Sequence, residues 1–313
     1  MKKMMRKALG LAFLTALVSC GGGGSQISTF SPERVIVFGD ESSYIGADGS
    51  KYTTNYVSDV GVADCANSPI WVQILAGSYG MSFPECPGST GSSAVGVMRA
   101  TVGGTLETMT TNIDAYLANF GFHDKDLVTV LIGANDLVNL FQRYPQTSAQ
   151  TLIAAAEQAG EQAAEQVNRI ATAGGRVVIL TVPDLGLTPY ALERDKFDPT
   201  SSAFLSQLTQ RFNAKLRVNI INDGHKIGLV VADELLQQIN KFPPGVDNGR
   251  ALDVTRVACS VALPECTNKT MVAYPDITAS PTTFLWADPL HLTAYGNSEL
   301  GKRVVSRAHS NPF

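Results

Sequence analysis

The chain has 313 residues, of which 44% are hydrophobic and 17% charged, and its formal net charge is −4. This composition is that of a globular protein long enough to bury one large core. No basic patch stands out, which argues against a nucleic-acid-binding protein.

The first pattern in chain order is at the N-terminus. Four basic residues within Met1–Lys7 precede an apolar run from Ala8 to Val18. This arrangement is typical of a signal peptide, and the run is too short to span a bilayer as a helix, which needs about 20 residues. The run ends in Leu17-Val-Ser-Cys20, which resembles the lipobox of bacterial lipoproteins.

That resemblance implies that Cys20 is lipidated and becomes the mature N-terminus, with a flexible Gly-rich tether behind it. We therefore expect a signal peptide over residues 1–19, a tether over 20–30 and one domain over 31–313. Because Gly21 rather than Asp follows Cys20, the rule for such proteins favours the outer membrane of a Gram-negative cell. An ordinary signal peptide with a chance cysteine is the alternative.

Four further cysteines are Cys65, Cys86, Cys259 and Cys266. An even number in an exported chain predicts disulfide bonds. Of the three pairings, we expect the local one, Cys65–Cys86 with Cys259–Cys266, because it closes two short loops. A metal site is the weaker alternative, since no Cys-x-x-Cys spacing or neighbouring His accompanies these residues.

Strand and helix patterns alternate along the chain. Strands are predicted at 34–38, 95–100, 126–132, 176–182 and 227–232, and helices at 69–79, 106–120, 148–173, 202–221 and 293–307. Such alternation favours a parallel sheet with helices on both faces. We expect the loop-rich segment 241–283 to be a surface excursion of the same domain.

Glycine-containing turns follow the first three predicted strands. They are Gly39-Asp40, Gly103-Gly104 and Gly133-Ala-Asn-Asp136. In a parallel sheet, ligands bind beyond the carboxyl ends of the strands. These turns are therefore candidates for one functional site. Each on its own is also explained as a loop or a helix cap.

Four blocks in order resemble those of the GDSL/SGNH hydrolase family. They are Val37-Phe-Gly-Asp-Glu-Ser-Ser-Tyr-Ile-Gly46, Val102-Gly-Gly104, Ile132-Gly-Ala-Asn-Asp136 and Trp286-Ala-Asp-Pro-Leu-His-Leu-Thr293. The resemblance covers nearly all of the mature chain. It implies the SGNH hydrolase fold, a three-layer α/β/α protein with a flavodoxin-like parallel sheet of about five strands.

The resemblance also implies roles in acyl transfer. The Gly103 N–H and the Asn135 amide would form the oxyanion hole. His291 would be the general base, and Asp288 would hold its imidazole in one tautomer. The reaction needs no metal or organic cofactor.

The chain departs from the family at the nucleophile, where Glu41 stands in place of the usual Ser. Three explanations are open. The turn is shifted by one residue and Ser42 attacks, or Glu41 itself acts as nucleophile or base, or catalysis is lost and the cleft binds a ligand. A flavodoxin-like cofactor binder fits poorly, because an acidic turn would repel phosphate.

The functional expectation is a lipid-anchored cell-envelope hydrolase acting on carboxylic esters, either small molecules or lipids. Its contact with the membrane would be the lipid on Cys20, and no nucleic-acid partner is expected. The alternative is a catalytically inactive lipoprotein of the same fold that binds an acyl or glycan ligand.

Overall fold

The protein is described from a computed structural model, which describes residues 30–86 and 92–310. The expected signal peptide and Cys20 lie outside these residues. Within them, no helix is both long and apolar enough to cross a bilayer.

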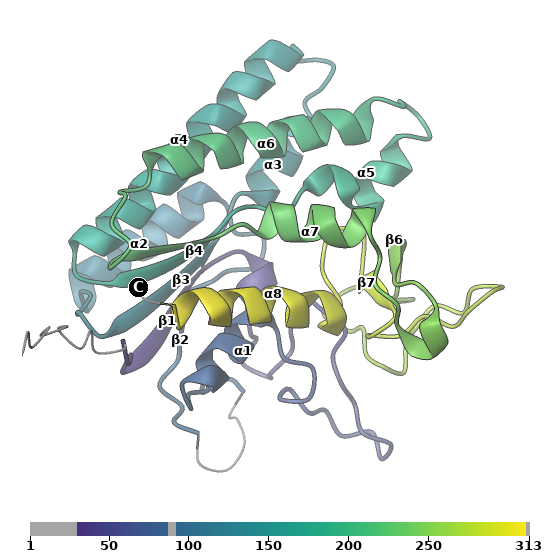
Figure 1. The fold of residues 1–313 in the computed structure, drawn as a ribbon, viewed down its shortest axis with the longest axis horizontal. Helices are drawn as coiled ribbons and strands as arrows, with labels where there is room; N and C mark the ends of the chain where they lie inside the picture. The colour runs from purple at the N-terminus through teal and green to yellow at the C-terminus, as the bar shows by residue number, and fades with distance from the viewer. Residues whose placement is uncertain (1–29, 87–91, 311–313) are drawn as a thin grey trace, which may run out of the picture.

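A five-stranded parallel sheet forms the centre of the fold (Figure 1). The strand order is β2-β1-β3-β4-β5, which is the flavodoxin-like order. The strands are β1 (Arg34–Gly39), β2 (Val97–Met98), β3 (Asp126–Leu131), β4 (Arg176–Leu180) and β5 (Ile227–Val230). The predicted fold class is therefore confirmed.

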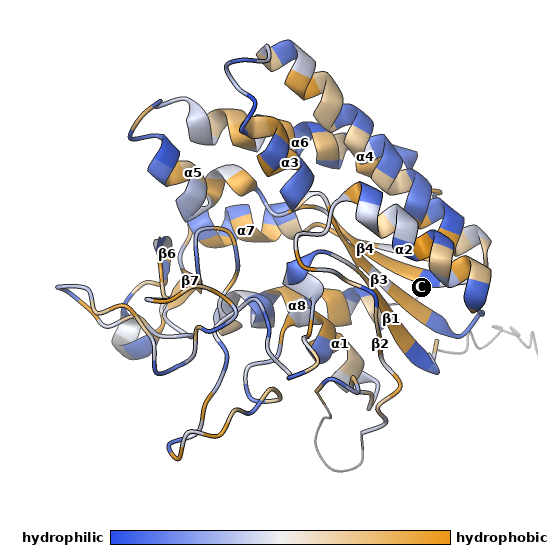
Figure 2. Ribbon diagram, turned by 180° about the vertical axis from the view of Figure 1, so that it is seen from behind, coloured by the Kyte–Doolittle hydropathy of each residue, from blue (hydrophilic) through white to orange (hydrophobic). Residues whose placement is uncertain are grey.

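Alternate residues of the strands enter two separate cores. Ile36 and Phe38 of β1 pack on one face, while Val35 and Val37 pack on the other. Because successive side chains of a strand point to opposite faces, a strand covered on both sides must be apolar throughout. Figure 2 shows this as strands that are hydrophobic along most of their length between two layers of helices.

The helices divide between these faces. Apolar residues of α2, α3, α4 and α6 join the first core, and those of α1, α7 and α8 join the second. The helices are α1 (Trp71–Ser78), α2 (Leu106–Asn119), α3 (Ala134–Phe141), α4 (Ala149–Thr172), α5 (Pro189–Arg194), α6 (Ser201–Asn219), α7 (Ala232–Lys241) and α8 (Ala294–Ala308).

The predicted elements differ from the observed ones in a few places. The strand expected at 95–100 is regular only at Val97–Met98, because it is an edge strand bonded to β1 alone. Helices α3, α5 and α7 were not predicted. One of these helices, α3, contains Asn135 in its first turn, so this residue does not lie in a free turn.

The segment 241–283 contains a short 3-10 turn, η3 (Asp247–Gly249), and strand β6 (Asp253–Val257). Strand β6 pairs in parallel with β7 (Phe284–Trp286), and Figure 1 shows this pair at the end of the molecule far from the C-terminus. The pair fixes the start of the loop that carries Asp288 and His291.

Both expected disulfides are present, so the local pairing is confirmed. Cys65 bonds to Cys86 and Cys259 bonds to Cys266. The second bond closes a loop of the 241–283 segment, beside the buried Ala287 that precedes Asp288.

Candidate active site

Glu41 follows β1 in a tight turn. Gly39 adopts a φ of +146°, and a Cβ there would lie 2.2 Å from the Leu131 carbonyl oxygen of the neighbouring strand, so only glycine fits. Asp40 then caps the 3-10 turn η1 (Glu41–Ser43), because its Oδ1 accepts from the Ser42 N–H at 3.0 Å. This turn directs the Glu41 side chain across the carboxyl ends of the strands.

The two expected oxyanion-hole donors both reach the Glu41 carboxylate. The Gly103 N–H donates to Glu41 Oε2 at 2.8 Å, and the Asn135 Nδ2 donates to the same oxygen at 3.0 Å. Asn135 Nδ2 also donates to the Gly104 carbonyl oxygen at 3.0 Å, which fixes the amide. The structure therefore places a carboxylate oxygen between the donors that the family uses for an oxyanion.

Asp288 and His291 lie in the loop between β7 and α8. Asp288 Oδ1 accepts from the backbone N–H groups of Leu290 at 2.8 Å and His291 at 2.7 Å, so the carboxylate organises the turn. His291 Nδ1 lies 2.9 Å from both Asp288 oxygens. Because a carboxylate only accepts, Nδ1 carries a proton, and Nε2 is the atom that faces the site.

His291 Nε2 lies 3.3 Å from Glu41 Oε1. The Glu41 carboxylate is therefore held at both oxygens, one by His291 and the other by the oxyanion donors. The side chains are largely buried, with 10% of Glu41 and 12% of His291 exposed. Tyr52 lies beside the imidazole, with 5.7 Å between the ring centres.

This arrangement sets the charges of the site. Burial alone would lower the pKa of His291, but hydrogen bonds to Asp288 and Glu41 and the charges of those two carboxylates raise it to about 10. Burial opposes ionisation of Glu41, yet its hydrogen bonds to His291 and Asn135 keep its pKa below the usual value. At neutral pH the pair is a carboxylate and an imidazolium.

The two serines of the turn form no hydrogen bond with His291. Ser42 Oγ forms no hydrogen bond with His291, and its backbone carbonyl accepts from Trp71 Nε1 at 3.1 Å. Ser43 is fully buried, and its Oγ has no hydrogen-bond partner in the described part of the chain. Of the candidates at this position, Glu41 is the one that contacts His291.

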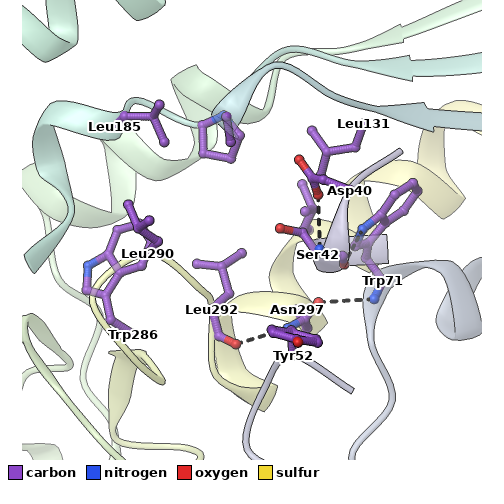
Figure 3. Close-up of a pocket in the computed structure, with 13 residues that line it drawn as sticks. Asp40, Ser42, Tyr52, Trp71, Leu131, Leu185, Trp286, Leu290, Leu292 and Asn297 are labelled. Carbon is purple, nitrogen blue, oxygen red and sulfur yellow. Dashed lines mark hydrogen bonds between the residues drawn. The ribbon is translucent and has the colours of Figure 1, made fainter. Parts of the chain in front are cut away.

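A cavity of about 40 Å³ adjoins these residues (Figure 3). Asp40, Ser42, Tyr52, Trp71 and Asn297 contribute to its lining together with leucines from β3, from α8 and from the loop between β7 and α8. Sequence patterns did not indicate it, because its walls come from five separate stretches of chain. Across the described ranges, no group of three or more His, Cys, Asp or Glu side chains is placed to hold a metal ion.

The sheet order, the Asp288–His291 pair and the two facing donors define an α/β protein with an acyl-hydrolase type of site. The chain matches the family model described as GDSL-like lipase/acylhydrolase over residues 35–304. The chain belongs to this family, whose members are ester hydrolases.

Solved structures with similar chains were also found. One is a member of the lipolytic G-D-S-L family from Veillonella parvula, at 10% identity, with 87% of this chain and 96% of that chain covered and a TM-score of 0.44. Another is an acetylxylan esterase from Geobacillus stearothermophilus, at 11% identity, with 90% and 97% covered and a TM-score of 0.42. No curated protein sequence matches the chain.

Proposed function

We propose that the chain hydrolyses carboxylic esters by acid–base catalysis between Glu41 and His291. The observation that carries this proposal is the position of the Glu41 carboxylate, 3.3 Å from His291 Nε2 and within reach of both oxyanion donors. An ionised Glu41 can accept a proton from an attacking water, and a protonated His291 can donate one to the departing alcohol.

The substrate carbonyl needs the donors that Glu41 occupies. Rotation of the Glu41 side chain frees the Gly103 N–H and one Asn135 N–H, and the carbonyl oxygen then enters between them. The donors stabilise the charge that develops on that oxygen when water attacks. Glu41 remains close enough to the reacting carbon to hold the water.

The test is steady-state turnover of an alkyl ester, whose alkoxide leaving group needs a proton, by residues 25–313 with the disulfides formed. Replacing His291→Ala should lower kcat/KM by about 100-fold or more, because the acid is removed. His225→Ala is the matched control, since His225 is exposed and lies on a loop before β5. Equal turnover by the wild-type chain and His291→Ala would contradict the proposal.

A second candidate is a non-catalytic lipoprotein that binds an acyl or glycan ligand in the same cleft. It is favoured by the fact that Glu41 Oε2 already satisfies both oxyanion donors. The Glu41→Ser variant separates the two functions. If the wild-type chain lacks turnover and Glu41→Ser gains it, together with labelling of residue 41 by a fluorophosphonate, the natural chain is a binder.

We further propose that the lipid on Cys20 anchors the enzyme in the cell envelope, in the outer membrane if the cell is Gram-negative. The Phe30 ring lies 4.2 Å from the guanidinium of Arg176, the first residue of β4, so the tether joins the domain at the amino ends of the strands. The site lies at the carboxyl ends and would face away from the anchor. Metabolic labelling with a fatty acid, lost in Cys20→Ala, tests this anchor.

A further inference from the structure

The position of the cavity next to the active site affects which substrates can bind. Its lining includes the sequence neighbours of three site residues. Asp40 and Ser42 flank Glu41, Ala134 precedes Asn135, and Leu290 and Leu292 flank His291. The cavity is therefore lined by the neighbours of Glu41, Asn135 and His291 in the chain.

The walls of the cavity are mostly apolar, and the tryptophan and asparagine groups among them are occupied. Trp71 Nε1 donates to the Ser42 carbonyl and Trp286 Nε1 to the Val254 carbonyl. Asn297 donates to the carbonyls of Leu292 and Thr293 and accepts from the Trp71 N–H. These indole and amide groups are satisfied within the protein, and the remaining hydroxyl-bearing residues of the lining are Ser42 and Tyr52.

Asp40 is the acidic residue of the lining. Asp40 is 1% exposed, and its Oδ1 accepts a hydrogen bond from the Ser42 N–H. Its Oδ2 is buried without a hydrogen-bond partner among the residues that the structure describes. Figure 3 shows the Asp40 carboxyl at the edge of the cavity, with one oxygen bonded to Ser42 and the other free of such a bond. A buried oxygen without a partner costs free energy, and at the edge of a cavity a ligand atom or a water can satisfy it.

We infer that this cavity is an acyl subsite for a short acyl chain that carries a hydroxyl group, with the hydroxyl hydrogen-bonded to Asp40 Oδ2. The acyl role rests on the proposed function. The volume of about 40 Å³ exceeds the roughly 10–15 Å³ that one water needs and favours a short acyl chain.

A hydroxyl suits Asp40 in both of its charge states. Burial and the nearby charge of Glu41 raise the pKa of Asp40 to about 7. The ionised carboxylate accepts from a hydroxyl, and the neutral acid donates to one. A ligand with only methylene groups leaves Oδ2 without a partner, and sites of this kind discriminate against such ligands.

The chain provides its own reporter for occupancy. It contains two tryptophans, Trp71 and Trp286, and both line the cavity. Their fluorescence can be followed during titration of Glu41→Ala with butyrate, 3-hydroxybutyrate and octanoate. In this variant the acid's carboxylate takes the place of Glu41 between the donors, so binding needs no turnover and failure of catalysis does not affect the result.

We expect 3-hydroxybutyrate to bind roughly tenfold more tightly than butyrate, as for one added hydrogen bond, and octanoate to bind most weakly. Adding Asp40→Ser to Glu41→Ala keeps a side-chain cap for η1 but removes Oδ2. The ratio of the affinities for 3-hydroxybutyrate and butyrate should then fall to about one. Adding Asp40→Asn keeps a polar atom there and should retain the preference.

Equal affinities for butyrate and 3-hydroxybutyrate in Glu41→Ala would overturn the inference, as would a preference that survives Asp40→Ser. Unchanged tryptophan fluorescence with every acid would also overturn it. If Glu41→Ala does not fold, the neutral methyl esters of the same two acids are titrated into His291→Ala, in which the proposed turnover is removed. The same preference is expected there, and equal affinities again contradict the inference.

Discussion

Glu41 Oε1 lies 3.3 Å from His291 Nε2, although the two residues are 250 positions apart in the chain. The contact replaces the Ser–His pair of a serine hydrolase with a carboxylate–imidazolium pair. It also reverses the charge state of the histidine, because a base for serine must be neutral whereas His291 is held protonated. The chemistry open to the site therefore differs from that of the serine members of the family.

Asn135 provides one prediction. If its amide stabilises the developing oxyanion, Asn135→Ala should lower kcat by about 100- to 1000-fold. Asn119→Ala is the matched control, since Asn119 ends α2 on the surface and bonds only to the Ala115 carbonyl. Steady-state turnover of a p-nitrophenyl ester measures both. A loss confined to KM would mean that Asn135 contributes to binding alone.

The pH dependence of turnover distinguishes the two mechanisms. With His291 as the acid, kcat/KM should hold steady through neutral pH and fall as pH rises through about 10. A serine mechanism would instead show activity rising near the ordinary histidine pKa of 6.5. Because Asp288 raises the pKa of His291, Asp288→Asn should shift the alkaline limb to lower pH. If the alkaline limb of the pH profile stays at the same pH in Asp288→Asn, His291 is not the titrating group.

The same pKa predicts a dependence of stability on pH. His291 has a folded pKa of about 10 against an unfolded value near 6.5, so the folded state binds the proton more tightly. Its contribution to the free energy of unfolding is full below pH 6.5 and is lost as pH rises toward 10.

The buried Lys51 acts in the opposite direction, because burial lowers its pKa to about 8. The check is therefore the difference between urea unfolding curves of the wild-type chain and His291→Gln from pH 6 to pH 10. That difference should shrink with rising pH. A constant difference would show that His291 is not protonated in the folded protein.

Much of the fold could be predicted from the sequence. Short, β-branched apolar runs such as Val35–Phe38 favour strands covered on both faces, and the Ala-rich segment that became α4 has strong helix propensity. Helix α7 also carries apolar residues at helical spacing, namely Leu235, Leu236 and Ile239. It was not predicted because it is short and follows β5 closely.

The site was predictable as a set of residues but not as a set of contacts. The block order placed Glu41, Gly103, Asn135, Asp288 and His291 at one edge of the sheet. Which atom of Glu41 bonds to which donor depends on the turn after Gly39, and no pattern specifies this. The free oxygen of Asp40 is also invisible in sequence, because it depends on what surrounding loops leave unbonded.

The most direct measurement for the central claim is turnover by Glu41→Ala with and without added formate. Removing the base should lower kcat by about 100-fold or more, and formate, bound beside His291 in the space left by the Glu41 carboxylate, should restore part of it. Glu107→Ala, a change on the exposed face of α2, should leave turnover unchanged. Undiminished turnover by Glu41→Ala, or a loss that no concentration of formate repairs, would contradict the role given to Glu41.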